Sequence, residues 1–321
     1  SKPNCCKSVH KAMLLTEFPD LQWLKRQAEE KFASRKTMQG SVLPHAGWPS
    51  VILNASTKKC CRDHIRGPLS IFTNITGTSA VEVGKKRVVV HSDFYYVTNQ
   101  DQYYTLDIKN PEGTETCNIH FGEYWADQVL ATWVAKPSTL VYEPYFTVPH
   151  QRFELHNKLY FKDEGFNRLL VKAKNAVSEL DEEETLYEIL VRLLENDRQI
   201  IKAAEKIPSI KHATRTEILK RLILAVDYIH SYYDKDLTLG ELASVSCFSK
   251  FHFLRLFKIV FNKTPYQFIN EVKIQHAKSL LLHSQQDIIS ISRALGFRDA
   301  SSFSRLFYNH TGLYPTQFRV N

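Results

Sequence analysis

Two stretches in the last quarter of this 321-residue chain, residues 250–258 and 298–305, carry side chains suited to reading nucleic-acid bases. Arginine can donate paired hydrogen bonds to guanine, serine can bond to any base edge, and an apolar group can meet a thymine methyl. At helical spacing, the first stretch presents on one face Lys250, Phe251, Leu254, Arg255 and Lys258. The second stretch presents on one face Arg298, Ala300, Ser301, Ser304 and Arg305. Both stretches are therefore predicted to be helices that enter the major groove of double-stranded DNA.

A second group of polar and aromatic residues lies between positions 91 and 125. These side chains could line a pocket for a small molecule. The alternative is that aromatic residues at alternating positions simply fill the core of a β domain. The group contains His91, Tyr95, Tyr96, Tyr103, Tyr104, His120, Glu123 and Trp125, and our candidates for effector binding are His91, Tyr95, Tyr104, His120 and Glu123.

Metal or covalent chemistry has less support in the sequence. An enzymatic cupin barrel needs a His-x-His pair, and no two of the 13 histidines lie two residues apart. The run Cys60-Cys61-x-x-His64 could form a thiolate metal or redox site, although idle thiols are commoner. The sequence has no glycine-rich phosphate loop and no nucleophile elbow. We therefore expect no metal, no cofactor and no enzymatic activity.

The residues around the two reading stretches repeat along the chain. Phe253-x-Arg255-Leu256-Phe257 returns as Phe303-x-Arg305-Leu306-Phe307, and Pro265-x-Gln267-Phe268 returns as Pro315-x-Gln317-Phe318, both fifty residues later. Each copy predicts a helix, a tight turn and a second helix: Leu239–Val245 before a cap at Ser249, and Ile288–Leu295 before a cap at Asp299. The repeat indicates a duplicated helix-turn-helix unit, at about 237–258 and 287–308.

Two further helices are expected around these units. One, about Thr216–Tyr232, precedes the first unit, and one, about Pro265–Leu282, joins the two. At ~1.5 Å per residue the joining helix spans roughly 25 Å, which would let the reading helices reach successive major grooves.

The first half of the chain is rich in β-forming runs instead. Glycine and proline separate these runs at a spacing typical of a sandwich or barrel. The runs are Leu69–Asn74, Arg87–His91, Phe94–Thr98 and Tyr103–Ile108, separated by Gly67-Pro68, Gly77, Gly84 and Asn110-Pro111. Helices are expected over 17–36 and 124–134.

From about residue 165 the pattern becomes helical. An apolar stripe runs from Phe166 to Leu180, and a second helix follows from Asp181 until Pro208. Its wide apolar face either packs on the β domain or forms a dimer interface. We expect an α+β fold with a β-rich effector-sensing domain at 1–164, a helical dimerisation and linker segment at 165–214, and a DNA-binding domain at 215–321.

Charge supports this division. The net charge is +8, and residues 215–321 hold 14 Lys and Arg against 8 Asp and Glu, which leaves 28 against 26 in the rest. The excess positive charge lies where a polyanion would bind. No apolar run reaches the length of a membrane span, no signal-peptide pattern begins the sequence, and the six cysteines suggest no secreted framework. We therefore expect a cytoplasmic protein.

The closing stretch resembles the AraC/XylS family of bacterial transcription regulators. It reads Gly296-Phe297-x-Asp299-x-Ser301-x-Phe303-Ser304-Arg305-x-Phe307, followed by Gly312, Pro315 and Phe318-Arg319. The resemblance covers residues 215–319 and implies a seven-helix module with two helix-turn-helix units. It implies base contacts from Phe251, Leu254 and Arg255 in the first unit, and from Ser301, Ser302 and Arg305 in the second.

The sequence departs from the family pattern at a few positions. Cys247 and Asn262 stand where glycine is frequent, and Leu254 and Ala300 stand where polar residues are frequent. The first unit is therefore expected to read thymine methyls or DNA shape more than hydrogen-bonding groups.

Relatives of this length usually place a dimerising, cupin-like effector barrel before the DNA-binding module. The resemblance thus implies a homodimeric regulator with a small-molecule effector and RNA polymerase as partners. Two alternatives stay open: a first half that is a ligand-free protein-interaction module, and a thiol- or metal-dependent sensor fused to the DNA-binding module.

Overall fold

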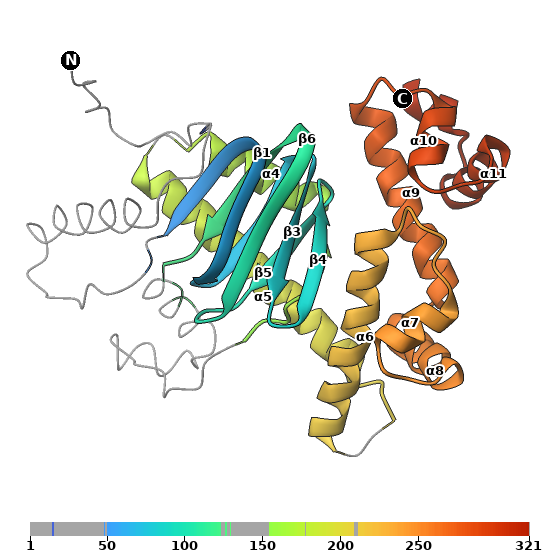
Figure 1. Cartoon of the computed structure of the whole chain (residues 1–321), viewed down its shortest axis with the longest axis horizontal. Helices are drawn as coiled ribbons and strands as arrows, with labels where there is room; N and C mark the ends of the chain where they lie inside the picture. The colour runs from blue at the N-terminus through green and yellow to red at the C-terminus, as the bar shows by residue number, and fades with distance from the viewer. Residues whose placement is uncertain are drawn as a thin grey trace, which may run out of the picture. The chain divides into compact units, whose positions relative to one another are not determined.

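The computed structural model describes residues 15, 48, 50–122, 126, 129, 154–176, 178–208 and 211–320, and Figure 1 shows the chain. The chain divides into two compact units, Ser1–Glu195 and Asn196–Asn321. The expected helix over 17–36 lies outside the described residues, as do Glu123 and Trp125. Of the expected helix over 124–134 only Ala126 and Val129 are described, and both are helical.

The first unit contains an antiparallel sheet of seven strands. They are β1 (Val51–Arg66), β2 (Ser70–Thr76), β3 (Thr78–Val83), β4 (Lys86–His91), β5 (Phe94–Thr98), β6 (Tyr103–His120) and β7 (Leu159–Phe161). The long strand β6 pairs with β1 along one edge and with β3 and then β2 along the other. β4 pairs with β3, β5 pairs with β2, and β7 pairs with β5. The strand-rich first half is confirmed.

One predicted strand end was wrong. Asn110-Pro111 does not end a strand, because β6 continues to His120. The register with β1 shifts here, from Thr57 opposite Thr114 to Lys59 opposite Lys109. The proline thus lies in a bulge, where a residue without an N–H group interrupts no ladder hydrogen bond.

Helix α4 (Glu164–Lys174) closes the aromatic core beside β5 and β7. Its residue Phe166 stacks on Tyr95 with ring centroids 4.1 Å apart, and Tyr95 stacks on Tyr160 at 5.2 Å. The helix ends before Asn175, so the expected stripe to Leu180 is broken. Ser178 and Asp181 exchange backbone and side-chain hydrogen bonds, which starts helix α5 (Glu179–Ala204) with a reciprocal cap.

The second unit is all helical. It contains α6 (His212–Tyr232), α7 (Leu239–Val245), α8 (Lys250–Phe261), α9 (Pro265–His283), α10 (Ile288–Ala294), α11 (Ala300–Thr311) and α12 (Pro315–Val320). Helices α7 and α8 form the first helix-turn-helix, and α10 and α11 form the second. Helix α9 contacts α8 and also packs against α10, α11 and α12. Both predicted caps, Ser249 and Asp299, are confirmed.

The repeated phenylalanines form two equivalent cores. In the first helix-turn-helix the Phe253 and Phe257 rings lie 5.3 Å apart, and Phe257 meets Phe268 edge-on at 5.5 Å. In the second, Phe303 and Phe307 lie 5.8 Å apart, and Phe307 meets Phe318 edge-on at 5.4 Å. The fifty-residue repeat is therefore a repeat of core packing, which aromatic pairs stabilise beyond the area that they bury. None of the described helices is both long and apolar enough to cross a membrane.

Candidate nucleic-acid interface

The first reading helix, α8, is positioned by a cap at each end. Ser249 accepts a hydrogen bond from the His252 N–H at 3.3 Å, and Asn262 ends the helix in the left-handed conformation. Between them Phe253, Leu256, Phe257 and Val260 are buried, and this fixes which face turns outward. That outward face presents the five predicted residues Lys250, Phe251, Leu254, Arg255 and Lys258, all exposed.

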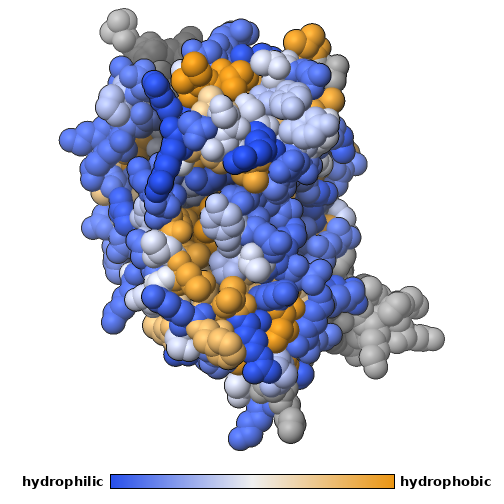
Figure 2. Space-filling model, turned by 90° about the vertical axis from the view of Figure 1, so that its right-hand side faces the viewer, coloured by the Kyte–Doolittle hydropathy of each residue, from blue (hydrophilic) through white to orange (hydrophobic). Residues whose placement is uncertain are grey.

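Two of these outward residues are apolar. Phe251 is 78% exposed and Leu254 is 37% exposed, although neither packs into the core. Figure 2 shows one face of the molecule, on which apolar side chains gather within a mostly hydrophilic surface. Exposed apolar side chains among cations suit a groove wall that offers methyl groups beside phosphates.

The second reading helix, α11, begins at a stronger cap. Asp299 accepts hydrogen bonds from the Ser302 N–H at 2.7 Å and from the Ser302 hydroxyl at 2.9 Å. These hydrogen bonds, first that of the Ser302 backbone, lower the pKa of Asp299. Ser301 and Arg305 are exposed, whereas Ser302 and Ser304 are half-buried. Because the Ser302 hydroxyl proton is engaged by Asp299, only its oxygen is left to accept from a base.

The two arginines at equivalent positions of the repeat both point outward from the reading helices. Arg255 and Arg305 are exposed, and neither forms an ion pair within the described part of the chain. After the hydrogen bonds of Ser302, the charge of Arg305 also helps to lower the pKa of Asp299. Arg298 differs, because it lies 3.9 Å from the Asp236 carboxylate, with both side chains 94% exposed.

Residues 242–321 match the model of a family described as a helix-turn-helix domain. The C-terminal third of this chain is an AraC-type DNA-binding module. The resemblance of this module to the AraC family, noted from the sequence, is confirmed.

Curated relatives are transcription regulators. The MmsAB operon regulatory protein of Pseudomonas aeruginosa is 36% identical over 100 residues, which are 30% of this chain and 33% of the relative. The lactose operon transcription activator of Staphylococcus xylosus is 29% identical over 115 residues, which are 36% of this chain and 41% of the relative. The chain thus spans between 33% and 41% of the length of these two relatives.

Solved structures give weaker likenesses. The DNA-binding domain of AdpA in complex with a target DNA is 21% identical, with a TM-score of 0.30, over 31% of this chain and 90% of that one. ToxT from Vibrio cholerae is 11% identical, with a TM-score of 0.33, over 85% of this chain and 98% of that one.

The candidate effector residues ahead of the AraC-type module lie in separate parts of the β domain. Tyr95 belongs to the stack with Tyr160 and Phe166. Tyr104 and His120 both meet Phe72, at centroid distances of 4.7 Å and 5.9 Å. His91 is half-buried at the end of β4, and Glu123 lies outside the described residues. The structure thus gives Tyr104 and His120 a shared neighbour, Phe72, whereas Tyr95 stacks on other rings.

Buried His120 has a defined tautomer. The Ser70 hydroxyl donates its one proton to the Pro68 carbonyl at 2.8 Å, so at 2.8 Å from His120 Nδ1 it must accept. His120 Nδ1 therefore carries a proton. Burial lowers the pKa of His120 to about 4, in agreement with a neutral ring.

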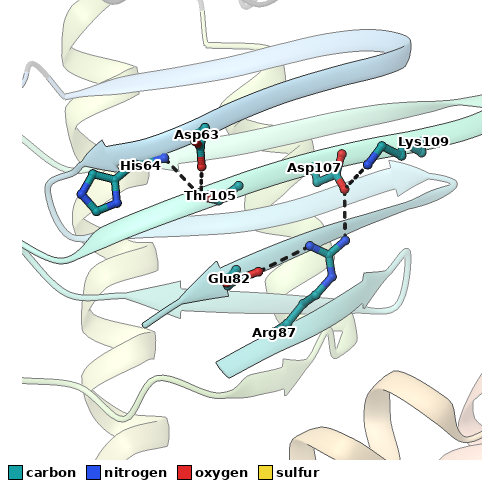
Figure 3. Close-up of polar contacts among 7 residues, drawn as sticks. All are labelled: Asp63, His64, Glu82, Arg87, Thr105, Asp107 and Lys109. Carbon is teal, nitrogen blue, oxygen red and sulfur yellow. Dashed lines mark hydrogen bonds and ion pairs between the residues drawn. The ribbon is translucent and has the colours of Figure 1, made fainter. Parts of the chain in front are cut away.

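Sequence reasoning missed a polar cluster on the sheet, shown in Figure 3. Asp107 on β6 accepts hydrogen bonds from Arg87 at 3.1 Å and from Lys109 at 2.9 Å, and Arg87 also lies 3.6 Å from Glu82. Burial acts to raise the pKa of Asp107, but the two cations outweigh burial and lower it. The cluster ties β4 to β6 across β3, so we assign it to the stability of the sheet.

The thiol run predicted as a weak metal candidate gains no support. The described residues contain no group of three or more His, Cys, Asp or Glu placed to hold a metal. Cys60 and Cys61 are successive residues of β1, so their side chains point to opposite faces of the sheet. Burial raises the pKa of Cys60, which lowers its reactivity as a thiolate.

Proposed function

We propose that this chain is a sequence-specific transcription regulator that reads two adjacent major grooves of double-stranded DNA with helices α8 and α11. The observation that carries the proposal is the equivalence of Arg255 and Arg305, which are exposed at matching positions of a duplicated unit and form no ion pair with a described residue. The relatives that regulate operons support the same activity.

The test uses a duplex selected by the full-length protein from a randomised library. Arg255→Ala and Arg305→Ala should each weaken binding by about 1–3 kcal/mol, or roughly 5- to 150-fold, and relax the base preference in one half-site only. Lys220→Ala is the matched control, because Lys220 is an exposed cation on α6, outside both reading faces. Unchanged affinity and preference in both arginine variants would contradict the proposal.

For the β-rich unit, Ser1–Glu195, we propose control of DNA binding, through a homodimer, a small-molecule effector and contact with RNA polymerase. The effector would act by favouring one dimer or interdomain arrangement over another. A thermal-shift screen of the full chain with candidate metabolites tests this, because a ligand that binds the folded state raises the melting temperature.

One observation favours a second candidate, a protein-interaction domain without a ligand. The candidate effector residues Tyr95, Tyr104 and His120 are all buried among other side chains. At Gly67, a Cβ atom would lie 2.6 Å from the Tyr104 ring, so even this glycine is packed against. Capture of a bacterial protein by residues 1–195 that alters DNA binding, with no metabolite that shifts melting, would favour this candidate.

A further inference from the structure

The second helix-turn-helix meets the connection between α6 and α7 through backbone atoms at one point. Gly296, in the turn between α10 and α11, has a φ of +72°, and a Cβ atom there would lie 2.0 Å from the Asp234 carbonyl oxygen and 2.7 Å from its carbonyl carbon. Asp234 follows α6, in the connection that leads to α7 and so to the first helix-turn-helix. Two backbones can approach this closely only where one residue has no side chain.

The first unit provides the comparison. Cys247 is the equivalent of Gly296, and it also has a positive φ, of 54°, yet its side chain is exposed. The turn therefore has a left-handed residue in both helix-turn-helix copies. In the second copy this residue must also lack a Cβ atom. The extra demand comes from Asp234.

Charged and aromatic groups surround the same contact. Lys273 on α9 is 8% exposed, and its Nζ lies 4.9 Å from the ring centroid of Phe297. Burial lowers the pKa of Lys273, and the carboxylates of Asp236 and Asp234 oppose that shift. The Asp236 carboxylate also lies 3.9 Å from the Arg298 guanidinium. In the same connection, the Tyr233 ring stacks on His276 of α9 with centroids 3.8 Å apart. The connection between α6 and α7 thus lies against Gly296 and beside Arg298, and Lys273 of α9 packs on Phe297 between them.

We infer that residues 233–237 lock the turn 295–299, so that α8 and α11 form one rigid reading body with a fixed spacing and phase. Asp234, Asp236 and Lys273 are then positioning residues, since they act on DNA through α11 rather than by touching it. The consequence for DNA rests on the proposed function: the protein should accept one half-site spacing and reject insertions between half-sites.

The lock itself is tested without DNA, by amide hydrogen exchange of the full chain. Gly296→Ala should speed exchange over residues 230–238 by roughly tenfold, because those residues lose their docking partner. Gly312→Ala is the matched control: its φ is +74°, and nothing lies within 4 Å of the added Cβ. It should disturb its own helix end and leave residues 230–238 unchanged.

A milder variant guards against loss of folding. Asp236 is exposed, so Asp236→Lys should fold and should speed exchange over 295–299 by about twofold, by placing a third cation beside Lys273 and Arg298. Unchanged exchange over 230–238 in Gly296→Ala and over 295–299 in Asp236→Lys would overturn the lock.

The DNA arm uses the selected duplex with one or two base pairs inserted between its half-sites. Each insertion should weaken the DNA affinity of the wild type by roughly tenfold or more. The same insertion should weaken the affinity of Gly296→Ala by a factor at least about threefold smaller. An equal loss in both proteins would overturn the positioning role. If the wild type selects no duplex, the proposed function fails, whereas the exchange result still decides whether the lock exists.

Discussion

Cys247 and Gly296 occupy the same place in two copies of one turn, 49 positions apart, and both have left-handed backbones with φ of 54° and 72°. A non-glycine residue pays a steric cost for this conformation because its Cβ approaches the following carbonyl oxygen. Cys247 is exposed, so its side chain gains little from packing in return. The first turn is thus more strained than the second.

Replacing this cysteine should therefore stabilise the module. Cys247→Gly is expected to raise the free energy of unfolding by about 0.5–1 kcal/mol, because relief of strain exceeds the added entropy of the unfolded chain. Urea denaturation followed by circular dichroism measures this. Asn262→Gly is the comparison, with a smaller gain, since asparagine tolerates the left-handed region. A lower unfolding free energy for Cys247→Gly would refute the assignment of strain.

The two units should differ in how they depend on thymine methyls. Phe251 and Leu254 give α8 an apolar reading face, whereas α11 presents Ser301 and Arg305. Replacing thymine by uracil in the first half-site should weaken binding by about 0.8 kcal/mol per contacted methyl, and the same change in the second should have little effect. Fluorescence anisotropy with matched duplexes measures both. In Leu254→Ala, part of the uracil effect should disappear; equal uracil effects in the two half-sites would count against the asymmetry.

The buried imidazole of His120 predicts that the folding stability of the β-rich unit falls in acid. The pKa of His120 is about 4 in the folded chain and ~6.5 when unfolded, so the unfolded state binds more protons between these values. Stability should therefore fall as the pH falls through this window, by on the order of 2 kcal/mol between pH 7 and pH 5.

Chemical denaturation at both pH values measures this loss. His120→Gln should lose less stability on acidification than the wild type does. His64→Gln, at an exposed position of β1, should keep the full dependence. A pH dependence that His120→Gln leaves intact would show that another group is responsible.

Helix α5 predicts where a dimer would form. Its face with Leu186, Ile189, Leu190 and Leu193 is buried in the single chain, so this apolar face is not available to a partner. Leu180 and Tyr187, seven residues apart and thus two turns along the helix, are 76% and 47% exposed.

Leu180→Asp combined with Tyr187→Asp should shift a dimer to monomers, since each apolar side chain buried between protomers contributes about 1.5–3 kcal/mol. Sedimentation equilibrium measures the association constant. Val171→Asp on α4 is the control, because Val171 is 59% exposed and lies off this stripe. A wild type that stays monomeric at micromolar concentration, or a double variant that stays dimeric, would rule out this surface.

The second unit was predictable because its signals are local. Ser249 and Asp299 each cap a helix through a residue three positions later, and the apolar spacing of Phe253 and Phe257 fixes the buried face. The repeat then confirms each assignment with its copy. What the repeat could not predict is the contact of Gly296 with Asp234, since Asp234 lies outside both copies of the repeat.

The first unit was harder because strand pairing joins distant residues. Tyr104 and His120 lie 16 positions apart on one strand, and only the packing of Phe72 from β2 shows that they share a neighbour. Arg87 reaches Asp107 across an intervening strand, which sequence periodicity does not encode. The prediction that a strand ends at Asn110-Pro111 was wrong for a similar reason, because a bulge resembles a turn in sequence.

Helix α9 has a consequence for how such a module can change over time. Its residue Phe268 completes the aromatic core of the first unit, while the same helix packs against α10, α11 and α12. The duplicated halves therefore share one structural element and cannot drift apart independently, because a substitution on α9 alters both. New DNA preferences should arise instead through the outward residues of α8 and α11, which can vary in one half without cost to the other.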